Sequence, residues 1–353
     1  MKTVLYVIHT ATIEMIKDLT MAITIHDVAR EAGTTISTVS KALNNSYAIS
    51  GETTIRIKEI ADRLGYRPNV RAQRLARRTN NEVVFLTKLT RDIAFTNPHM
   101  FEMMVGVEAA LASKGYSLKI QGCDEDNVCV LAKEIMDRKQ ADGLLVHGFV
   151  ATRELTVLLT RLEIPHIVVG KPVFSSSVCW VDNNNQLSGE LAAAHLLELG
   201  HRKIAYIGAP EEDKISQARL DGIINRMKEF DPKLEPISVH RGESTVEVGV
   251  SLATELIKKL KPDAIVCANN ILAYGTLRAL QKNGIVVPDD ISLVTFDDYP
   301  LTKITSPNLT TINLDMYELG LSAGKLLLSK IKSPDLQVQS YTTVPRLIKR
   351  DST

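Results

Sequence analysis

Residues 24–44 read TIHDVAREAGTTISTVSKALN, which is the pattern of two short helices joined by a tight turn. Thr24 and Thr35 are good N-cap residues, because a side-chain hydroxyl can accept a free backbone N–H at a helix start. Gly33 can end the first helix, because glycine adopts positive φ without steric cost. Two helices separated by a turn of about four residues form a helix-turn-helix unit, which is the fold that this stretch predicts.

A third helix is expected to begin after Ser50. Its apolar residues recur at helical spacing and would face the other two helices; they are Ile57, Ile60, Ala61 and Leu64. We expect residues 66–69 to end this helix, because Pro68 biases the residue before it away from α geometry. The predicted head therefore spans residues 21–67.

The second helix, residues 36–43, is the element that we expect to enter the major groove of DNA. Val39 is apolar and should point into the head, which leaves short polar and β-branched side chains for the outer face. Side chains of this kind let a helix approach base edges closely. The DNA contacts expected from this unit are Thr35, Ile36, Ser37, Thr38, Ser40 and Lys41. The alternative is a small polar bundle without a ligand.

A basic segment follows the third helix, and we interpret residues 68–80 as a hinge helix and linker. Four arginines crowd residues 69–78. An isolated helix of under about 12 residues is marginal in water, so we expect this one to order against DNA and a second subunit. Leu75 would then insert between base steps of the minor groove. The expected DNA contacts here are Asn69, Arg71, Ala72 and Leu75, and the alternative is a charged, solvated linker.

Charge is distributed unevenly along the chain. Residues 21–80 hold ten lysines and arginines against five acids, a local net charge of +5, whereas the whole chain carries +1. Residues 1–20 are neutral, so residues 81–353 carry −4. A basic head on an acidic body indicates that only the head meets a polyanion.

Several classes of protein are disfavoured by the composition. Residues 1–20 hold an apolar run too short for a signal peptide, so we interpret them as a disordered extension or a start-site artefact and expect a cytoplasmic protein. No apolar run approaches the about 20 residues of a membrane span. The four cysteines have no metal-ligand spacing and are expected to be idle thiols; they are Cys123, Cys129, Cys179 and Cys267. Because no catalytic motif or phosphate-binding loop is present either, we expect no enzyme, no metal and no cofactor.

The body, residues 81–353, alternates short apolar runs with amphipathic helices, which indicates parallel sheets in doubly wound α/β layers. The expected strands are 83–87, 116–120, 143–147, 166–169, 203–207, 264–267 and 292–296. The expected helices are 101–114, 128–138, 186–199, 217–230, 246–259 and 272–283. We predict two lobes with chain crossovers near 181 and 314. The first would hold about 81–181 and 314–331, and the second about 182–313 and 332–353.

Polar residues follow several of the predicted strands. Ligands of doubly wound folds bind beyond the C-terminal ends of strands. A carboxylate, an amide and a guanidinium from separate strand ends suit a polyhydroxylated ligand, since each hydroxyl both donates and accepts. The candidate effector-binding residues are His99, Met100, Arg219, Asn269 and Asp297. The alternatives are a solvated loop at Asp297, a helix cap at Asn269 and a surface position for Arg219.

The head resembles that of the lactose-repressor/galactose-repressor family of bacterial transcription regulators. The match covers residues 24–44, the LGYRPN at 64–69 and the spacing of Ala72 and Leu75. The resemblance implies that Ile36, Ser37 and Lys41 read bases and that Leu75 is the minor-groove wedge. Two positions depart from the family pattern: Thr34 stands where an aliphatic residue is usual, and Thr54 stands where an arginine is usual.

The body resembles the same family's effector domain, which is similar to periplasmic sugar-binding proteins. The match includes NPHM at 97–100, VDNNN at 181–185, LGHRKIAYIG at 199–208 and FDD at 296–298, and the resemblance extends over residues 22–350. It implies that Arg219, Asn269 and Asp297 hold the effector from one lobe and the NPHM loop contributes from the other. The family often has aromatic residues where His99 and Met100 stand, and Trp180 is a candidate replacement. The GKP at 170–172 most resembles the maltose/maltodextrin-regulator branch.

The resemblance implies a homodimeric repressor of carbohydrate-utilisation genes. It would bind double-stranded operator DNA and respond to a small sugar or sugar-like effector. The alternative from another class is a sugar-binding receptor protein without DNA function. Such a receptor should carry a signal peptide and lack residues 24–78.

Overall fold

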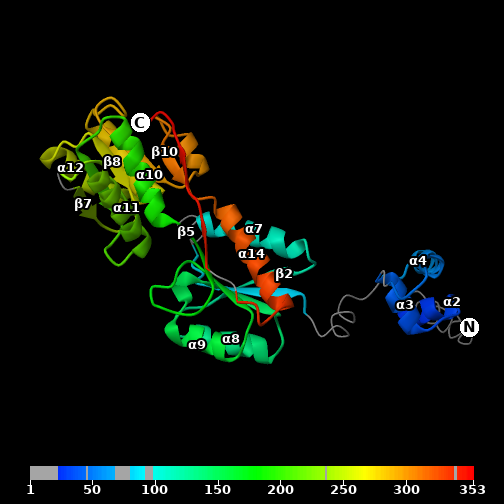
Figure 1. Cartoon of the computed structure of the whole chain (residues 1–353). Coiled ribbons are helices and arrows are strands. Elements are labelled where there is room, and N and C mark those ends of the chain that lie inside the picture. The colour runs from blue at the N-terminus through cyan, green and yellow to red at the C-terminus, as the bar shows by residue number, and fades with distance from the viewer. Residues whose placement is uncertain (1–22, 45–46, 68–79, 92–97, 235–236, 338–339) are drawn as a thin grey trace, which may run out of the picture. The chain divides into compact units, whose positions relative to one another are not determined.

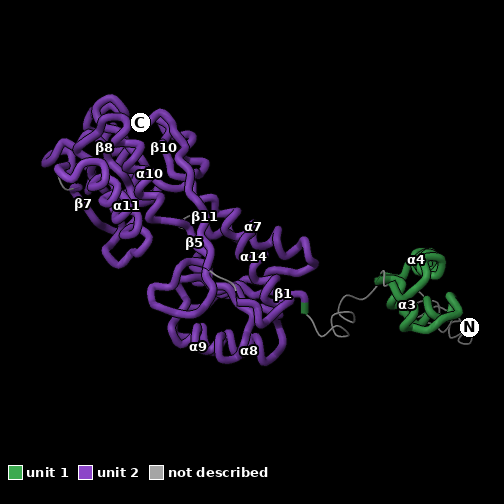
Figure 2. Tube along the Cα trace, in the orientation of Figure 1, with its two compact units in different colours: residues 1–80 green, residues 81–353 purple. Residues whose placement is uncertain are grey.

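The computed structural model describes residues 23–44, 47–67, 80–91, 98–234, 237–337 and 340–353. The chain forms two compact units, residues 1–80 and 81–353, which are coloured separately in Figure 2. Among the described residues, none of the helices has both the length and the apolar character needed to cross a bilayer.

The described residues of the first unit form three helices: α2 (Ile25–Glu31), α3 (Ile36–Leu43) and α4 (Gly51–Leu64). The Thr35 hydroxyl accepts the backbone N–H of Thr38 at 3.2 Å, and the Ser50 hydroxyl accepts that of Thr53 at 3.3 Å, as their N-cap positions predict. The three helices bury one apolar cluster, which includes Val28, Val39, Ala42, Ile57 and Ala61. The predicted helix-turn-helix arrangement is therefore confirmed.

The predicted end of the third helix is wrong. The helix stops at Leu64, and Gly65 follows in the left-handed region at φ 69°, ahead of residues 66–69. Glycine has no Cβ to clash in that region, so it ends the helix before Pro68 can act. Tyr66 then folds back into the core of the head, where it is buried.

In the second unit, the part of the chain that the structure describes forms two six-stranded sheets. The strands of the first are β1 (Glu82–Thr87), β2 (Ser117–Gly122), β3 (Gly143–His147), β4 (His166–Val169), β5 (Trp180–Asn183) and β11 (Tyr341–Thr343). They are all parallel, in the order β11-β5-β4-β3-β1-β2. Those of the second are β6 (Ile204–Gly208), β7 (Ser238–Arg241), β8 (Ala264–Cys267), β9 (Ser292–Phe296), β10 (Thr310–Asn313) and β12 (Arg346–Ile348). Their order is β12-β10-β9-β8-β6-β7, with only β12 antiparallel to its neighbour.

Helices cover both faces of the first sheet (Figure 1). They are α7 (Pro98–Ala112) and α14 (Met316–Lys332) on one face, and α8 (Val128–Asp137) and α9 (Arg153–Arg161) on the other. Successive strand residues point to opposite faces, so Val83 and Phe85 pack against the first pair of helices and Val84 and Leu86 against the second. The doubly wound α/β prediction is confirmed for this lobe.

Two glycines let α7 and α14 approach closely. A Cβ on Gly320 would lie 1.9 Å from the backbone oxygen of Met103, and one on Gly106 would lie 2.1 Å from that of Tyr317. No side chain fits at such separations, so the absence of a Cβ at both positions sets the contact between the helices. This contact places the start of α7, with His99 and Met100, at one end of the sheet.

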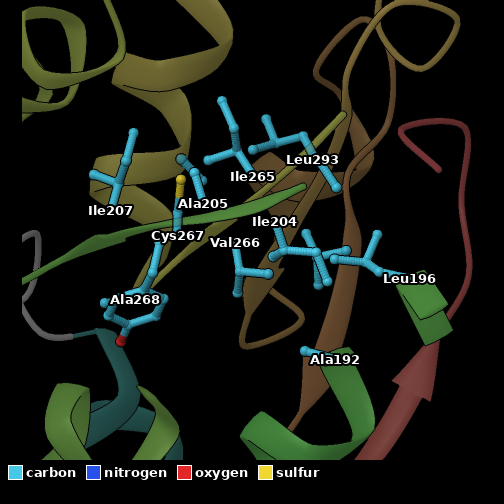
Figure 3. Packing of buried hydrophobic residues seen from close by; sticks show 14 of the residues in the cluster. Ala192, Leu196, Ile204, Ala205, Ile207, Ile265, Val266, Cys267, Ala268 and Leu293 are labelled. Atoms are coloured by element: carbon cyan, nitrogen blue, oxygen red, sulfur yellow. The ribbon is translucent and has the colours of Figure 1, made fainter. Parts of the chain in front are cut away.

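The second lobe holds one larger core. Its helices are α10 (Asn185–Glu198), α11 (Lys214–Phe230), α12 (Val246–Lys259) and α13 (Asn270–Lys282). Figure 3 shows Ala192 and Leu196 of α10 beside Ile204 of β6 and Val266 of β8. These side chains belong to a cluster of aliphatic residues that holds the helix on the sheet.

The lobe boundaries differ from the prediction at the C-terminal end. Strand β11, residues 341–343, pairs with β5 in the first sheet, whereas the prediction places 332–353 wholly in the second lobe. The last crossing therefore lies between β11 and β12. Five short strands and two helices, α9 and α14, were not predicted; the strands are β5, β7, β10, β11 and β12. Each of these strands has at most two aliphatic residues, whereas the equally short predicted strand β8 is apolar throughout.

Candidate functional site

One face of α3 is free to meet a ligand. Val39 and Ala42 are fully buried in the head, while Ser37 and Lys41 are exposed and Ile36 is 39% exposed. The free side chains occur at helical spacing, so they share one outward face. This is the face that the sequence predicted for base contacts.

The remaining predicted DNA contacts fall into two groups. The Thr35 and Thr38 hydroxyls lie 2.9 Å apart and are occupied in capping α3, so they position the helix start; Ser40 is half-buried. Asn69, Arg71, Ala72 and Leu75 lie outside the described residues.

The body contains a cavity of about 510 Å³ that residues of both lobes line. All five predicted effector-binding residues line it: His99, Met100, Arg219, Asn269 and Asp297. They come from the start of α7, from α11 and from the ends of β8 and β9. The rule that ligands bind beyond strand ends therefore found the right part of the fold.

Asp297 lines this cavity and contacts charged or titratable side chains of both lobes. It is 3% exposed, and its Oδ2 lies 3.2 Å from Nε2 of His99 and 3.8 Å from Nη2 of Arg219. Its φ is 75°, a left-handed conformation that aspartate tolerates better than most residues. The Asn270 side chain donates to its backbone oxygen at 3.0 Å. The carboxylate therefore sits at a constrained turn and is not a solvated loop residue.

Arg219 is buried and held from three directions. Its Nε donates to Asn185 Oδ1 at 3.2 Å, and its Nη1 donates to the backbone oxygen of Ala268 at 2.5 Å. The guanidinium carbon also lies 4.3 Å from the centre of the Phe296 ring, within cation–π range. The alternative of a surface position is therefore wrong.

His99 links the first lobe to Asp297. Its ring lies edge to face with Tyr299 at 4.6 Å between centroids. Burial lowers the pKa of His99, although the Asp297 carboxylate acts in the opposite direction. Nε2 of the ring nevertheless faces the carboxylate at 3.2 Å, so the two lobes meet at this contact. Met100 lines the same wall but is 4% exposed, so little of it is open to a ligand.

Comparison with known proteins places this architecture in a family. Residues 24–69 match the model described as "Bacterial regulatory proteins, lacI family", and residues 193–353 match the "Periplasmic binding protein-like domain". The ribose operon repressor of Haemophilus influenzae is 31% identical over 336 residues, covering 93% of this chain and 98% of that protein. The chain belongs to the lacI family.

Other lacI-family relatives are similar over comparable lengths. The transcriptional repressor PurR of Vibrio vulnificus is 28% identical and covers 93% of this chain and 98% of the relative. A structure of the CelR regulator–cellobiose complex has a TM-score of 0.69 at 25% identity, covering 94% of this chain and all of that chain. An operator-bound lac repressor dimer has a TM-score of 0.76 at 22% identity, covering 94% and 99%, and shares the fold. The predicted family resemblance and fold class are confirmed, and the maltose branch remains a prediction.

Three further residues of this lacI-family body differ in their relation to the cavity. Asn269 lines the cavity and also caps α13, since its Oδ1 accepts the Leu272 backbone N–H at 3.0 Å. Asp298 binds Arg350, with Lys303 at 3.1 Å, and is not among the described cavity residues. Trp180 is not among them either; it packs under Lys171, so it cannot be the ring that replaces the missing aromatics.

Many cavity residues were not predicted from the sequence, among them His147, Phe149, Asp182 and Asp213. His147 and Phe149 lie at and just after the end of β3, where the strand-end rule would have found them. Burial lowers the pKa of His147 to about 4. Burial raises the pKa of Asp182, whose oxygens accept the backbone N–H groups of Lys171 and Asn183 at 3.0 and 2.7 Å.

Proposed function

We propose that this chain is a transcriptional repressor that binds operator DNA as a homodimer and is controlled by a small sugar-like effector in the cavity of the body. The observation that carries the proposal is the outward face of α3. Its inner residues Val39 and Ala42 complete the core of the head, while Ile36, Ser37 and Lys41 stay accessible. In a lacI-family head with excess positive charge, this face suits the major groove.

Dimeric binding is supported by the geometry of DNA. A helix-turn-helix monomer reads only a few base pairs, and a two-fold dimer reads two half-sites about one helical turn apart. The related lac repressor structure is a dimer bound to operator. Asn69, Arg71, Ala72 and Leu75 belong to the proposal as hinge contacts to the minor groove.

Control by an effector follows from the position of the cavity. Residues of both lobes line it, so a ligand changes the energy of one lobe arrangement relative to another. Coupling of about 1–3 kcal/mol between ligand and DNA sites is typical and changes occupancy about 5–150-fold. The structure of the related CelR regulator is that of its complex with cellobiose, and the structure of a related regulator from Enterococcus faecium contains bound ribose. We infer from these a repressor of carbohydrate-utilisation genes that acts in the cytoplasm.

DNA binding by the full-length protein tests the proposal. A duplex is selected from a random-sequence pool, and its affinity is measured by fluorescence anisotropy at several salt concentrations. We expect affinity to fall steeply with salt, because bound counterions are released. Lys41→Ala should weaken binding about tenfold or more. The matched control is Lys258→Ala, which removes an exposed cation from α12 of the body and should leave affinity unchanged.

Two results would overturn the DNA-binding function. One is the selection of no sequence by the wild-type protein, which favours the sugar-binding receptor. The other is an equal effect of Lys41→Ala and Lys258→Ala, which would mean that binding follows net charge and not the face of α3.

A further inference from the structure

We infer that the cavity takes an uncharged, polyhydroxylated ring, which donates hydrogen bonds to the second lobe, lies with one face on Phe149, and cannot be replaced by its phosphate ester. This ligand class rests on the proposed role of the cavity as the effector site. The inference goes beyond that role, because it states which ligands the cavity binds and which it excludes. It also gives a role to Phe149, which the sequence did not predict as a ligand contact.

Three described residues of the cavity wall each have a buried polar atom without a hydrogen-bond partner; the Tyr299 hydroxyl can donate or accept, whereas the other two atoms can only accept. Asp297 Oδ1 and Asn270 Oδ1 are buried and have no hydrogen-bond partner among the residues that the structure describes. Asp297 is 3% exposed and Asn270 is 7% exposed, and both line the cavity. Their oxygens can only accept, so a ligand that completes them must donate. Neighbouring hydroxyls supply such donors, whereas the oxygens of a phosphate dianion supply none.

The charges around the cavity oppose an anion. Asp182, Asp213 and Asp297 bring three carboxyl groups, and Arg219 is the single lysine or arginine among the described lining residues. The guanidinium is already committed to Asn185, the Ala268 backbone oxygen and Asp297.

The two histidines of the cavity wall, His99 and His147, add no positive charge to the lining. Burial lowers the pKa of both His99 and His147, the latter to about 4, so neither carries positive charge at neutral pH. A phosphate in this cavity would face carboxylates without a free cation to bind it.

Phe149 adds a flat apolar ring to the cavity lining from the first lobe. It lies on η1 (Gly148–Val150), directly after β3, and is 61% exposed although it lines the cavity. Its ring stands perpendicular to that of His147 at 5.0 Å between centroids, which holds it in place. Val169 and Met316 add apolar surface to the cavity.

An aromatic ring beside apolar side chains suits the C–H face of a sugar ring, whose hydroxyls then point toward the second lobe. Phe149, which follows β3, therefore provides the aromatic surface that His99 and Met100 do not.

The test uses full-length protein and matched pairs of ligands: ribose with ribose 5-phosphate, glucose with glucose 6-phosphate, and cellobiose with cellobiose 6-phosphate. Each is added at up to about 10 mM in thermal unfolding, since a ligand that binds only the folded state raises the Tm. Isothermal titration gives the Kd of any that bind. We expect at least one uncharged member to bind and its phosphate ester to bind at least about tenfold more weakly.

Variants then test which residues of the cavity wall determine ligand affinity. Phe149→Ala should weaken the uncharged ligand about tenfold, and Phe149→Tyr should keep its affinity. Phe230→Ala is the control, because Phe230 is a partly exposed phenylalanine that is not among the described cavity residues. Asp213→Asn should reduce the difference in affinity between a sugar and its phosphate ester. The amide oxygen can still accept the Ser216 backbone N–H, so the helix cap is kept while the charge is lost.

Three outcomes would overturn the inference. They are a phosphate ester that binds as tightly as its parent sugar, an affinity that Phe149→Ala leaves unchanged, and binding by no uncharged member of the panel. The last would leave the DNA-binding function intact if the same preparation still selects and binds a duplex. If duplex binding alone were lost, the proposed DNA-binding function would be refuted and the inferred ligand class would still stand.

Discussion

Removing the Arg219 guanidinium tests how the cavity wall is held together. The substitution Arg219→Met keeps an unbranched apolar stem but removes two hydrogen bonds and one ion pair. Asn185 Oδ1 and the backbone oxygen of Ala268 lose their donor, and the Asp297 carboxylate loses the guanidinium 3.8 Å away. Because Arg219 and Asp297 are 4% and 3% exposed, water cannot easily replace the lost donor.

The expected loss in the free energy of unfolding is about 3–5 kcal/mol. A buried acceptor without a partner costs about 1–3 kcal/mol, and breaking a buried ion pair from one side costs about 3–5 kcal/mol. These values describe overlapping effects and are not summed. Adding Asp297→Asn removes the unpaired charge, so the double variant should lose less than the sum of the two single variants.

Urea unfolding followed by the fluorescence of Trp180 is the assay. Trp180 is the only tryptophan of the chain and lies in the body, so the signal is independent of the head. The matched control is Arg226→Met, which removes a half-buried arginine of the same helix whose ion pair with Glu229 lies at the surface. A loss below about 1 kcal/mol for Arg219→Met, or strict additivity with Asp297→Asn, would refute the account of the wall.

Two further predictions concern stability. Burial lowers the pKa of His166 to about 4, so the folded body keeps this imidazole neutral while the unfolded chain binds a proton below about pH 6.5. The neutral imidazole therefore favours the folded state fully above about pH 6.5, and about 3 kcal/mol of the free energy of unfolding is lost as the pH falls toward about 4. The free energy of unfolding of His166→Gln should depend less steeply on pH than that of the wild type. An unchanged pH dependence would contradict this. Gly320→Ala should destabilise the body by about 1–3 kcal/mol or more, because the new Cβ would meet the Met103 backbone oxygen. Thermal unfolding measures this, and a Tm equal to that of Gly51→Ala, where the Cβ meets no atom within 4 Å, would refute it.

The head could be predicted almost completely from the sequence. Its caps at Thr35 and Ser50, and the inward residues Val39 and Ile57, are local signals that lie within one short stretch of chain. The end of α4 differs from the prediction, because Gly65 ends the helix before Pro68 can act.

The cavity could be predicted only in part. Asp297 and Asn269 were found because parallel strands bring their C-terminal ends to one edge. Phe149 also follows a predicted strand, but in the sequence an apolar side chain at that place does not distinguish a ligand contact from a core residue. Trp180 was the candidate for that ring and lies elsewhere.

The sequence by itself determined the class of the protein: caps, helical periods and strand-end residues are properties of short segments, and they specify a DNA-reading head and a doubly wound body. Only the tertiary structure decided that His99 meets Asp297, that Arg219 is enclosed by Asn185 and Ala268, and that residues 341–343 return to the first sheet. The reason is physical. Local signals act between neighbours in the chain, whereas these contacts join distant segments through the packing of whole helices and sheets.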